Sequence, residues 1–415
     1  MDNIEFYEVK NVNKTIINFV FNIDYNRDDI IKKQMMIRML SNYTNKLKTA
    51  KNYVEKRKSL YIMDYDSFII KMKDSAALNI RFVIPKIDIL NDFDLEAAIK
   101  FMFEVLFKPY VSNNQFNIKA FNCELNYLKS REKDYPHSIS EYAYDKFLDF
   151  VDESNKMDLH YDEYINYLNT VNSKTTYDYY LKSIKNNGFK IYVFGNKSDK
   201  NDILVNLSKV FKNDNSTNKI SSKKYDFFSI VDYKEKLVET NYNQSVLSLF
   251  YQFQKMSSKD LIKLEMLYYF LNSRENNLLY NELRYKNQLI YTSYVRYSMY
   301  YGIISLVVFL DYELLDKVEE AISLMLKQLK SKENYELYKK RLVKAIEYDM
   351  LDNEDDPFYV MKEVFNKKYS KDNILKLKLK KINDMTFESF VEFLNRMVLT
   401  RKMVMKSGDK DDKKN

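Results

Sequence analysis

The feature of this chain that most constrains its fold is an internal repeat. Residues 98–106 align with residues 321–329, and alanine, isoleucine, methionine and leucine recur at matching positions. An apolar, strand-like run precedes each copy, at 79–84 in one and at 303–309 in the other. A repeated order of elements indicates a repeated structural unit, so we expect two similar domains in tandem.

Three further elements follow the same order in both halves: a strand, a helix after it, and a long amphipathic helix near the end of the repeat. Apolar residues alternate or run together in the strands, and they fall at helical spacing in the helices. The predicted positions are 15–21, 28–44 and 116–133 in the first half and 245–251, 258–271 and 334–351 in the second.

These patterns predict an α+β fold of two tandem domains, each a mostly antiparallel sheet packed with helices. The length of 415 residues agrees with two or three domains. The run 190–195 is predicted to be an edge or closing strand of the first domain, and the Ser/Asn-rich stretch 213–222 marks a linker. We predict a first domain over 1–205, a linker region over 206–235, a second domain over 236–405 and a charged tail over 406–415.

The charge of the chain gives little support to nucleic-acid binding. The formal net charge is +8, but 59 acidic residues are interleaved with 67 basic ones. The densest basic runs, 327–332 and 376–381, alternate with apolar residues or lie beside acidic ones, as on a solvated face. Nucleic-acid binding needs positive charge clustered on one face, so no nucleic-acid partner is predicted.

Cysteine usage and hydropathy predict a cytoplasmic protein without a membrane span. The single cysteine, Cys123, excludes an internal disulfide framework, and we expect it to be a small buried or half-buried residue. The first residues lack the layout of a signal peptide. The longest apolar run, 302–310, is about half the length that a bilayer requires.

The sequence lacks the usual catalytic and metal-binding patterns. It has only two histidines, His137 and His160, and the inverted zinc motif H-x-x-E-H does not occur. His160 begins the near match H-x-x-E-Y but lies in a Tyr-rich connecting region, and His137 is interpreted as a turn residue beside a helix. The four glycines form no Gly-rich phosphate loop. We therefore assign no metal to this chain.

Residues 278–292 carry a more specific pattern, LLYNELRYKNQLIYT: the end of a helix, a polar break and the start of a strand. This segment resembles the LF..LREK.GLAY signature in the second domain of insulinase/pitrilysin-type zinc peptidases. In that family the arginine and the tyrosine seven residues later hold the substrate near the metal. The matching positions are Arg284 and Tyr291, and the resemblance implies that both bind substrate. Gln288 stands where the family has glycine.

The same resemblance points to a zinc site that this chain has lost. Aligning the first long helix with the family motif places Gln34 and Arg38 at the two histidine positions and Ile37 at the catalytic glutamate. If Glu124 is the family's second acidic residue, the third ligand position falls on Arg131. An arginine repels zinc and an isoleucine cannot accept a proton, so these positions neither bind the metal nor activate water.

The resemblance therefore implies a non-catalytic subunit, similar to those of Gram-positive bacteria, that pairs with a zinc-bearing H-x-x-E-H paralogue. Its two domains would form one half of a clamshell, and two such subunits would enclose a chamber that admits peptides. Arg284 and Tyr291 would hydrogen-bond the substrate backbone and stabilise developing oxyanion charge. The chain alone is expected to have no peptidase activity, no catalytic residue and no cofactor, with zinc in the partner.

Besides nucleic-acid binding, a distant third that salt-dependent retention on heparin or DNA would test, two alternatives stay open on the sequence alone. One is a purely structural or interaction subunit without a role in proteolysis. The other is a self-contained peptidase whose metal site the known motifs do not reveal. The position of Arg284 and Tyr291 relative to the partner's zinc tests the first alternative. Metal analysis of the purified chain tests the second.

Overall fold

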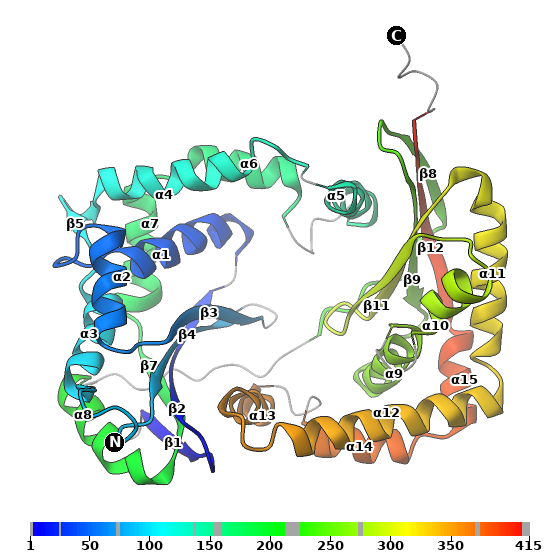
Figure 1. Ribbon diagram of the computed structural model, residues 1–415. Coiled ribbons are helices and arrows are strands. Elements are labelled where there is room, and N and C mark those ends of the chain that lie inside the picture. The colour runs from blue at the N-terminus through cyan, green and yellow to red at the C-terminus, as the bar shows by residue number, and fades with distance from the viewer. Residues whose placement is uncertain are drawn as a thin grey trace. The chain divides into compact units, whose positions relative to one another are not determined.

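Figure 1 shows the computed structural model, which describes residues 3–24, 26–71, 75–136, 138–152, 159–211, 225–272, 277–369 and 374–408. The chain divides into two compact units, and neither is a continuous stretch of sequence. The first unit comprises Met1–Tyr135, Tyr161–Lys223 and Asp352–Lys371, and the second comprises Pro136–His160, Lys224–Leu351 and Asp372–Asn415.

The first unit is built on a five-stranded sheet in which every neighbouring pair but one is antiparallel. β1 runs parallel to β7, with Ile4 opposite Ile191. β1 therefore occupies the edge beside β7, so of the two roles predicted for 190–195 the edge position is wrong; β7 is instead the last strand of this sheet in chain order. In sheet order the strands are β1 (Ile4–Glu8), β7 (Phe189–Gly195), β2 (Lys14–Asp24), β4 (Ser75–Pro85) and β3 (Asp64–Lys71).

Both faces of this sheet are covered because alternate strand residues point to opposite sides. On one side Val20 belongs to a buried cluster with Val364 and Phe365 of α13. On the other side Phe19 contacts Phe211, with ring centroids 4.9 Å apart. The helices are α1 (Ile30–Asn42), α2 (Ala50–Ser59), α3 (Leu95–Phe107), α4 (Ile118–Arg131), α6 (Tyr161–Thr170), α7 (Ser173–Tyr180), α8 (Lys200–Val210) and α13 (Pro357–Tyr369), with 3₁₀ turns at Arg27–Asp29 and Lys197–Asp199, a π-helical turn at Leu181–Lys185, and a short hairpin of β5 (Val111–Ser112) and β6 (Gln115–Phe116).

The second unit repeats this plan. Its sheet is also antiparallel except at one edge, where β8 runs parallel to β12. Strand β9 sends Leu247 and Leu249 into one buried cluster and Val246 and Phe250 into another on the opposite face. In sheet order the strands are β10 (Thr292–Ser298), β11 (Ile303–Leu310), β9 (Ser245–Phe253), β12 (Met397–Lys406) and β8 (Lys234–Glu239).

The two faces of the second sheet differ in what covers them. Helix α5 packs on the face that carries Phe250, through Ala143 and Phe147. The other helices build the larger cluster on the opposite face. The helices of this unit are α5 (Ile139–Val151), α9 (Leu261–Asn272), α10 (Leu278–Tyr280), α11 (Leu315–Gln328), α12 (Lys332–Asp352), α14 (Leu375–Asn383) and α15 (Phe387–Asn395), with 3₁₀ turns at Ser258–Asp260 and Tyr312–Leu314 and a π-helical turn at Asn281–Lys286.

The predicted fold class is confirmed: two mixed five-stranded sheets, each packed with helices. The repeated segment 98–106 lies in α3, after strand β4. Its counterpart 321–329 follows strand β11 and lies in α11 except for its last residue, Leu329, which caps that helix. The two halves also exchange one helix each. Helix α5 comes from the first half of the sequence but belongs to the second unit, and α13 does the reverse.

The segments predicted to join and end the domains are only partly described. In the predicted linker region α8 reaches Val210 and β8 begins at Lys234, while residues 212–224, including the Ser/Asn-rich stretch, lie outside the described residues. Of the predicted tail, β12 includes Lys406, and residues 409–415 are not described. None of the described helices is both long and apolar enough to cross a membrane.

Candidate functional site

Arg284 lies on a short helical segment whose buried leucines pack into the core of the second unit. The side chain of Asn277 caps α10 by accepting a hydrogen bond from the backbone N–H of Tyr280 at 3.3 Å. Leu279 and Leu283 are completely buried in the core cluster. These anchors fix the segment and leave Arg284 exposed at its surface.

The turn after Arg284 keeps the conformation that usually requires glycine. Gln288 adopts a φ of 53°, in the left-handed region. Its N–H donates to the carbonyl of Arg284 at 3.2 Å, and the N–H of Leu289 donates to the carbonyl of Leu283 at 2.8 Å. Gln288 therefore preserves the tight turn. Its left-handed backbone conformation is strained, because a residue with a Cβ atom clashes with its own backbone there.

The structure brings the two predicted substrate-binding residues close together. The guanidinium of Arg284 donates through Nη1 to the carbonyl of Ile290 at 2.8 Å. The backbone N–H of Tyr291 donates to the carbonyl of Phe309 at 2.8 Å, which starts the β10–β11 ladder. Ile290 directly precedes Tyr291, so the bond from Arg284 holds its guanidinium near the start of β10, and its charge acts to lower the pKa of Tyr291. We call these two residues the Arg/Tyr pair.

Asp311 is a partner of this pair that sequence reasoning missed. The hydroxyl of Tyr291 lies 2.9 Å from both carboxylate oxygens of Asp311. This hydrogen bond is the main cause of the raised pKa of Tyr291, and it outweighs the opposing charge of Arg284. Asp311 directly follows the apolar strand β11, and only the antiparallel pairing of β10 with β11 brings it beside Tyr291.

Arg38, which the resemblance aligns with a lost zinc ligand, meets Glu124, the candidate for the family's second acidic residue, in the first unit. Arg38 on α1 donates to Glu124 on α4, with Nε and Nη2 at 2.8 and 2.5 Å from Oε2. Tyr43 donates to the other carboxylate oxygen at 3.0 Å. Glu124 is only 5% exposed, so an ion pair occupies the space between the two helices.

The neighbours of this ion pair are equally unsuited to a metal. Burial, and to a lesser degree the charge of Glu132, raise the pKa of Tyr164, while a hydrogen bond with Gln34 and the charges of Arg131 and Arg38 oppose that shift. Burial also lowers the pKa of Lys33, one residue before Gln34, to about 8. Zinc prefers thiolate, imidazole and carboxylate ligands, and this set offers mainly cations and an amide.

No group of three or more histidine, cysteine or acidic side chains that could hold a metal occurs within the described ranges. The imidazole Nδ1 of His160 lies 2.9 Å from an oxygen of Asp149, and its side chain is half-buried. His137 lies outside the described residues. Cys123 is exposed, so the expectation that it is buried is wrong. It misses the buried stripe of α4, which comprises Ala120, Phe121, Glu124 and Leu128.

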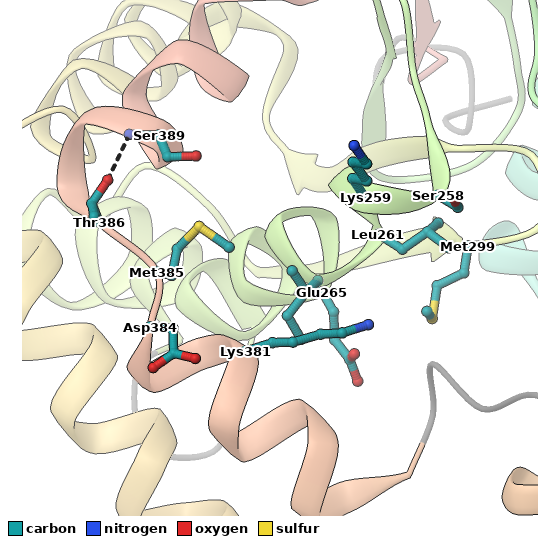
Figure 2. A pocket seen from close by; sticks show the side chains of 11 residues that line it. Ser258, Lys259, Leu261, Glu265, Met299, Lys381, Asp384, Met385, Thr386 and Ser389 are labelled. Carbon is teal, nitrogen blue, oxygen red and sulfur yellow. Dashed lines mark hydrogen bonds between the residues drawn. The ribbon is translucent and has the colours of Figure 1, made fainter.

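A separate cavity lies in the second unit, where α9 meets the connection between α14 and α15 (Figure 2). Its volume is about 470 Å³, and its lining includes Leu261, Ile262 and Met385. Glu265 is 6% exposed in its wall and pairs with Lys378 at 2.6 Å. Arg284 and Tyr291 do not line this cavity, so the cavity is separate from the Arg/Tyr pair.

The chain thus combines two similar α+β units, an ion pair at Arg38, a position that the resemblance aligns with a zinc ligand, and an exposed Arg/Tyr pair. Residues 170–347, which include the Arg/Tyr pair, match the family model described as the peptidase M16 inactive domain. This match and the fold shared with pitrilysin and other proteases confirm the predicted resemblance to insulinase/pitrilysin-type peptidases.

Solved structures share the fold over almost the whole chain. A conserved protein from Enterococcus faecalis V583 is 18% identical with a TM-score of 0.80, over 99% of this chain and 97% of that one. A protease from Helicobacter pylori is 13% identical with a TM-score of 0.69, over 97% and 96%. Pitrilysin is 12% identical with a TM-score of 0.63, and this chain matches 43% of its length over 100% of its own. No curated protein matches the chain in sequence.

Proposed function

We propose that this chain is the non-catalytic subunit of a heterodimeric zinc peptidase that cleaves peptides. It would supply the Arg/Tyr pair and part of the wall of a substrate chamber, while an H-x-x-E-H partner supplies the zinc and the attacking water. The observation that carries this proposal is a half-complete site: the bond from Arg284 to Ile290 holds its side chain near Tyr291 at the surface, whereas Arg38, at a position that the resemblance aligns with a zinc ligand, is paired with Glu124. The lone cysteine supports a reducing, cytoplasmic location.

The pair has the chemistry to hold a peptide backbone. One guanidinium N–H of Arg284 is used by the carbonyl of Ile290, and the group carries five N–H donors. The bond to Ile290 restrains the side chain, so less conformational entropy is lost when a substrate carbonyl binds. A fixed cationic donor near a scissile bond also stabilises negative charge that develops on the carbonyl oxygen.

The alternative of a purely structural or interaction subunit is supported by one observation. Both members of the pair are hydrogen-bonded within the chain, Arg284 to Ile290 and Tyr291 to Asp311. Such bonds also suit residues that only brace the start of β10 against β11. Mutation of the pair in an active assembly separates the two functions.

The test is reconstitution with an H-x-x-E-H paralogue from the same genome, assayed with a quenched fluorogenic peptide. We expect no cleavage by this chain alone, cleavage by the mixture, and loss of cleavage when a chelator removes the partner's zinc. Arg284→Ala should lower kcat/KM of the mixture roughly 10- to 100-fold, because a positioned donor to the reacting carbonyl is lost.

Lys286→Ala is the matched control for this experiment. Lys286 lies two residues after Arg284, is exposed and pairs with Glu282 within the same helical turn. Its removal should leave kcat/KM unchanged. Wild-type cleavage by the Arg284→Ala mixture, with assembly intact by size-exclusion chromatography, would favour the structural alternative.

A further inference from the structure

We infer that Asp311 sets the hydrogen-bond polarity of the Arg/Tyr pair, so that Tyr291 accepts a hydrogen bond from the substrate while Arg284 donates one. This inference rests on the proposed function and deepens it. It assigns a positioning role to Asp311 and a specific partner on the substrate to each member of the pair.

The first step concerns the single phenol proton of Tyr291. An ionised carboxylate can only accept hydrogen bonds, so the phenol must be the donor in its contacts of 2.9 Å with both oxygens of Asp311. With its proton directed at Asp311, the phenol oxygen has only lone pairs to offer to a further partner.

The second step concerns how Asp311 is used. It occupies the N-cap position of the 3₁₀ turn Tyr312–Leu314, where an aspartate side chain ordinarily accepts from a backbone N–H. No such capping bond is formed within the described part of the chain, and no described lysine or arginine forms an ion pair with Asp311. Among the residues that the structure describes, Tyr291 is therefore the side-chain partner of this carboxylate.

The third step concerns Arg284. A guanidinium has no acceptor, so every contact that Arg284 makes is a donation. Nη1 is held by the carbonyl of Ile290 at 2.8 Å, and the remaining N–H groups belong to an exposed side chain. The pair thus presents a donor and an acceptor side by side.

An extended peptide matches this polarity, because its backbone offers both carbonyl and N–H groups along one edge. Arg284 would receive a substrate carbonyl, and Tyr291 would receive a substrate N–H. This differs from the expectation that both residues donate to the scissile carbonyl. In the polarity inferred here, Arg284 alone supports the developing oxyanion, and Tyr291 fixes the register of the substrate.

The test is backbone N-methylation of a fluorogenic peptide cleaved by the reconstituted complex, with each N–H methylated in turn. We expect one position at which N-methylation raises KM about tenfold, the effect of losing one hydrogen bond in a positioned pair. With Tyr291→Phe this penalty should disappear, and with Asp311→Ala it should shrink, because the phenol proton is then free to turn toward the substrate. The same peptides serve for every variant, so conformational effects of methylation cancel.

Two results would overturn the inference. One is an N-methylation penalty of the same size in Tyr291→Phe and wild type. The other is a fall in kcat for every peptide in Tyr291→Phe with no dependence on N-methylation, as expected of a phenol that donates to the oxyanion.

A measurement on the isolated chain separates this inference from the proposed function. In a chain labelled with ¹³Cζ-tyrosine, the resonance of Tyr291 can be assigned by its loss in Tyr291→Phe and followed with pH. Its pKa should fall in Asp311→Asn, because the carboxylate that raises it is gone. An unchanged pKa contradicts the inference whatever the activity. If the pKa falls but neither Arg284→Ala nor Tyr291→Phe affects cleavage, the proposed function fails instead, and the inference with it.

Discussion

Arg38 and Glu124 are joined at two points, with the guanidinium Nε and Nη2 at 2.8 and 2.5 Å from the same carboxylate oxygen. Tyr43 takes the second oxygen at 3.0 Å, so both oxygens of Glu124 are engaged. Arg38, which the family resemblance places at a lost zinc ligand, therefore belongs to a closed network with Glu124 and Tyr43. Because a guanidinium stays protonated in proteins, this network opposes a divalent cation at every accessible pH.

Arg38→Ala is expected to lower the free energy of unfolding by about 2 kcal/mol, since it removes the cationic partner of a nearly buried carboxylate and leaves it the neutral hydroxyl of Tyr43. The loss should be smaller than for a fully buried pair, because the side chain of Arg38 is 27% exposed. Urea denaturation measures it. Lys51→Ala, which breaks an exposed pair with Glu55, is the control and should change little.

The double variant Arg38→Met/Glu124→Leu tests whether the charge of Glu124 causes the loss of stability in Arg38→Ala. Replacing both charges with apolar groups of similar size removes the uncompensated carboxylate, so most of the lost stability should return. A double variant as unstable as Arg38→Ala would show that packing between α1 and α4, and not the charge, dominates.

Lys33→Met should stabilise the protein at neutral pH. Burial lowers the pKa of Lys33 from 10.5 to about 8, so below pH 8 the folded state carries an ammonium that prefers water. Removing it should raise the free energy of unfolding by about 1–2 kcal/mol at pH 7, after allowance for solvent screening.

The stabilisation by Lys33→Met should depend on pH. Between pH 8 and 10.5 the unfolded chain still binds the proton and the folded chain does not, so wild-type stability rises with pH in that window. The advantage of Lys33→Met should therefore disappear near pH 10.5. Lys51→Met, at a side chain 83% exposed, is the control and should show no such convergence.

Gln288→Gly should also stabilise the chain, here by relieving backbone strain. Gln288 has a φ of 53°, which glycine adopts without a steric penalty. The larger freedom of glycine in the unfolded chain offsets part of the gain, so we expect up to about 1 kcal/mol in urea denaturation. The same substitution at Gln328, the last residue of α11, should be destabilising. A loss of stability in Gln288→Gly would mean that the glutamine side chain makes contacts worth more than the strain.

Much of the fold was predictable because its signals are local. The apolar runs that became β2, β4, β9 and β11 and the helical spacing of α1, α3, α9 and α11 are readable within single windows of sequence. The exchange of α5 and α13 was not predictable, because an amphipathic helix fits the apolar face of either sheet. Strand β8 was missed because it is exposed along most of its length and shows no apolar alternation.

The site residues likewise fall into those with a sequence signal and those without one. A fixed spacing identified Arg284 and Tyr291 as candidates, and alignment with a motif identified Arg38 and Glu124, which the structure places in contact. Asp311 carries no local signal, since an aspartate after a strand is common in turns. Its position beside Tyr291 depends on the register of β10 against β11, which a single sequence does not specify.

The start of α9 provides a prediction for acid pH. Burial pushes the pKa of Asp260 upward, but hydrogen bonds from Arg396 and Ser257 and the charges of Arg396 and Lys263 bring it below its ordinary value of 3.8. Above pH 3.8 the ionised carboxylate stabilises the fold, and this contribution is lost as the pH falls through the lower folded-state pKa. Asp260→Asn should therefore be less stable than wild type at pH 6, and the difference should narrow below pH 3.8.

Ser257→Ala is the informative comparison, because it removes the hydroxyl that lies 2.8 Å from Asp260 but keeps the carboxylate and its contact with Arg396 at 2.6 Å. This variant should lose about 1 kcal/mol, as for other N-cap substitutions, while retaining most of the acid-dependent loss seen in wild type. Urea denaturation between pH 3 and 6 measures all three proteins under one protocol. If Asp260→Asn stayed below wild type by a constant amount across that range, the carboxylate would act through packing and capping geometry, and its charge would contribute nothing to the stability of α9.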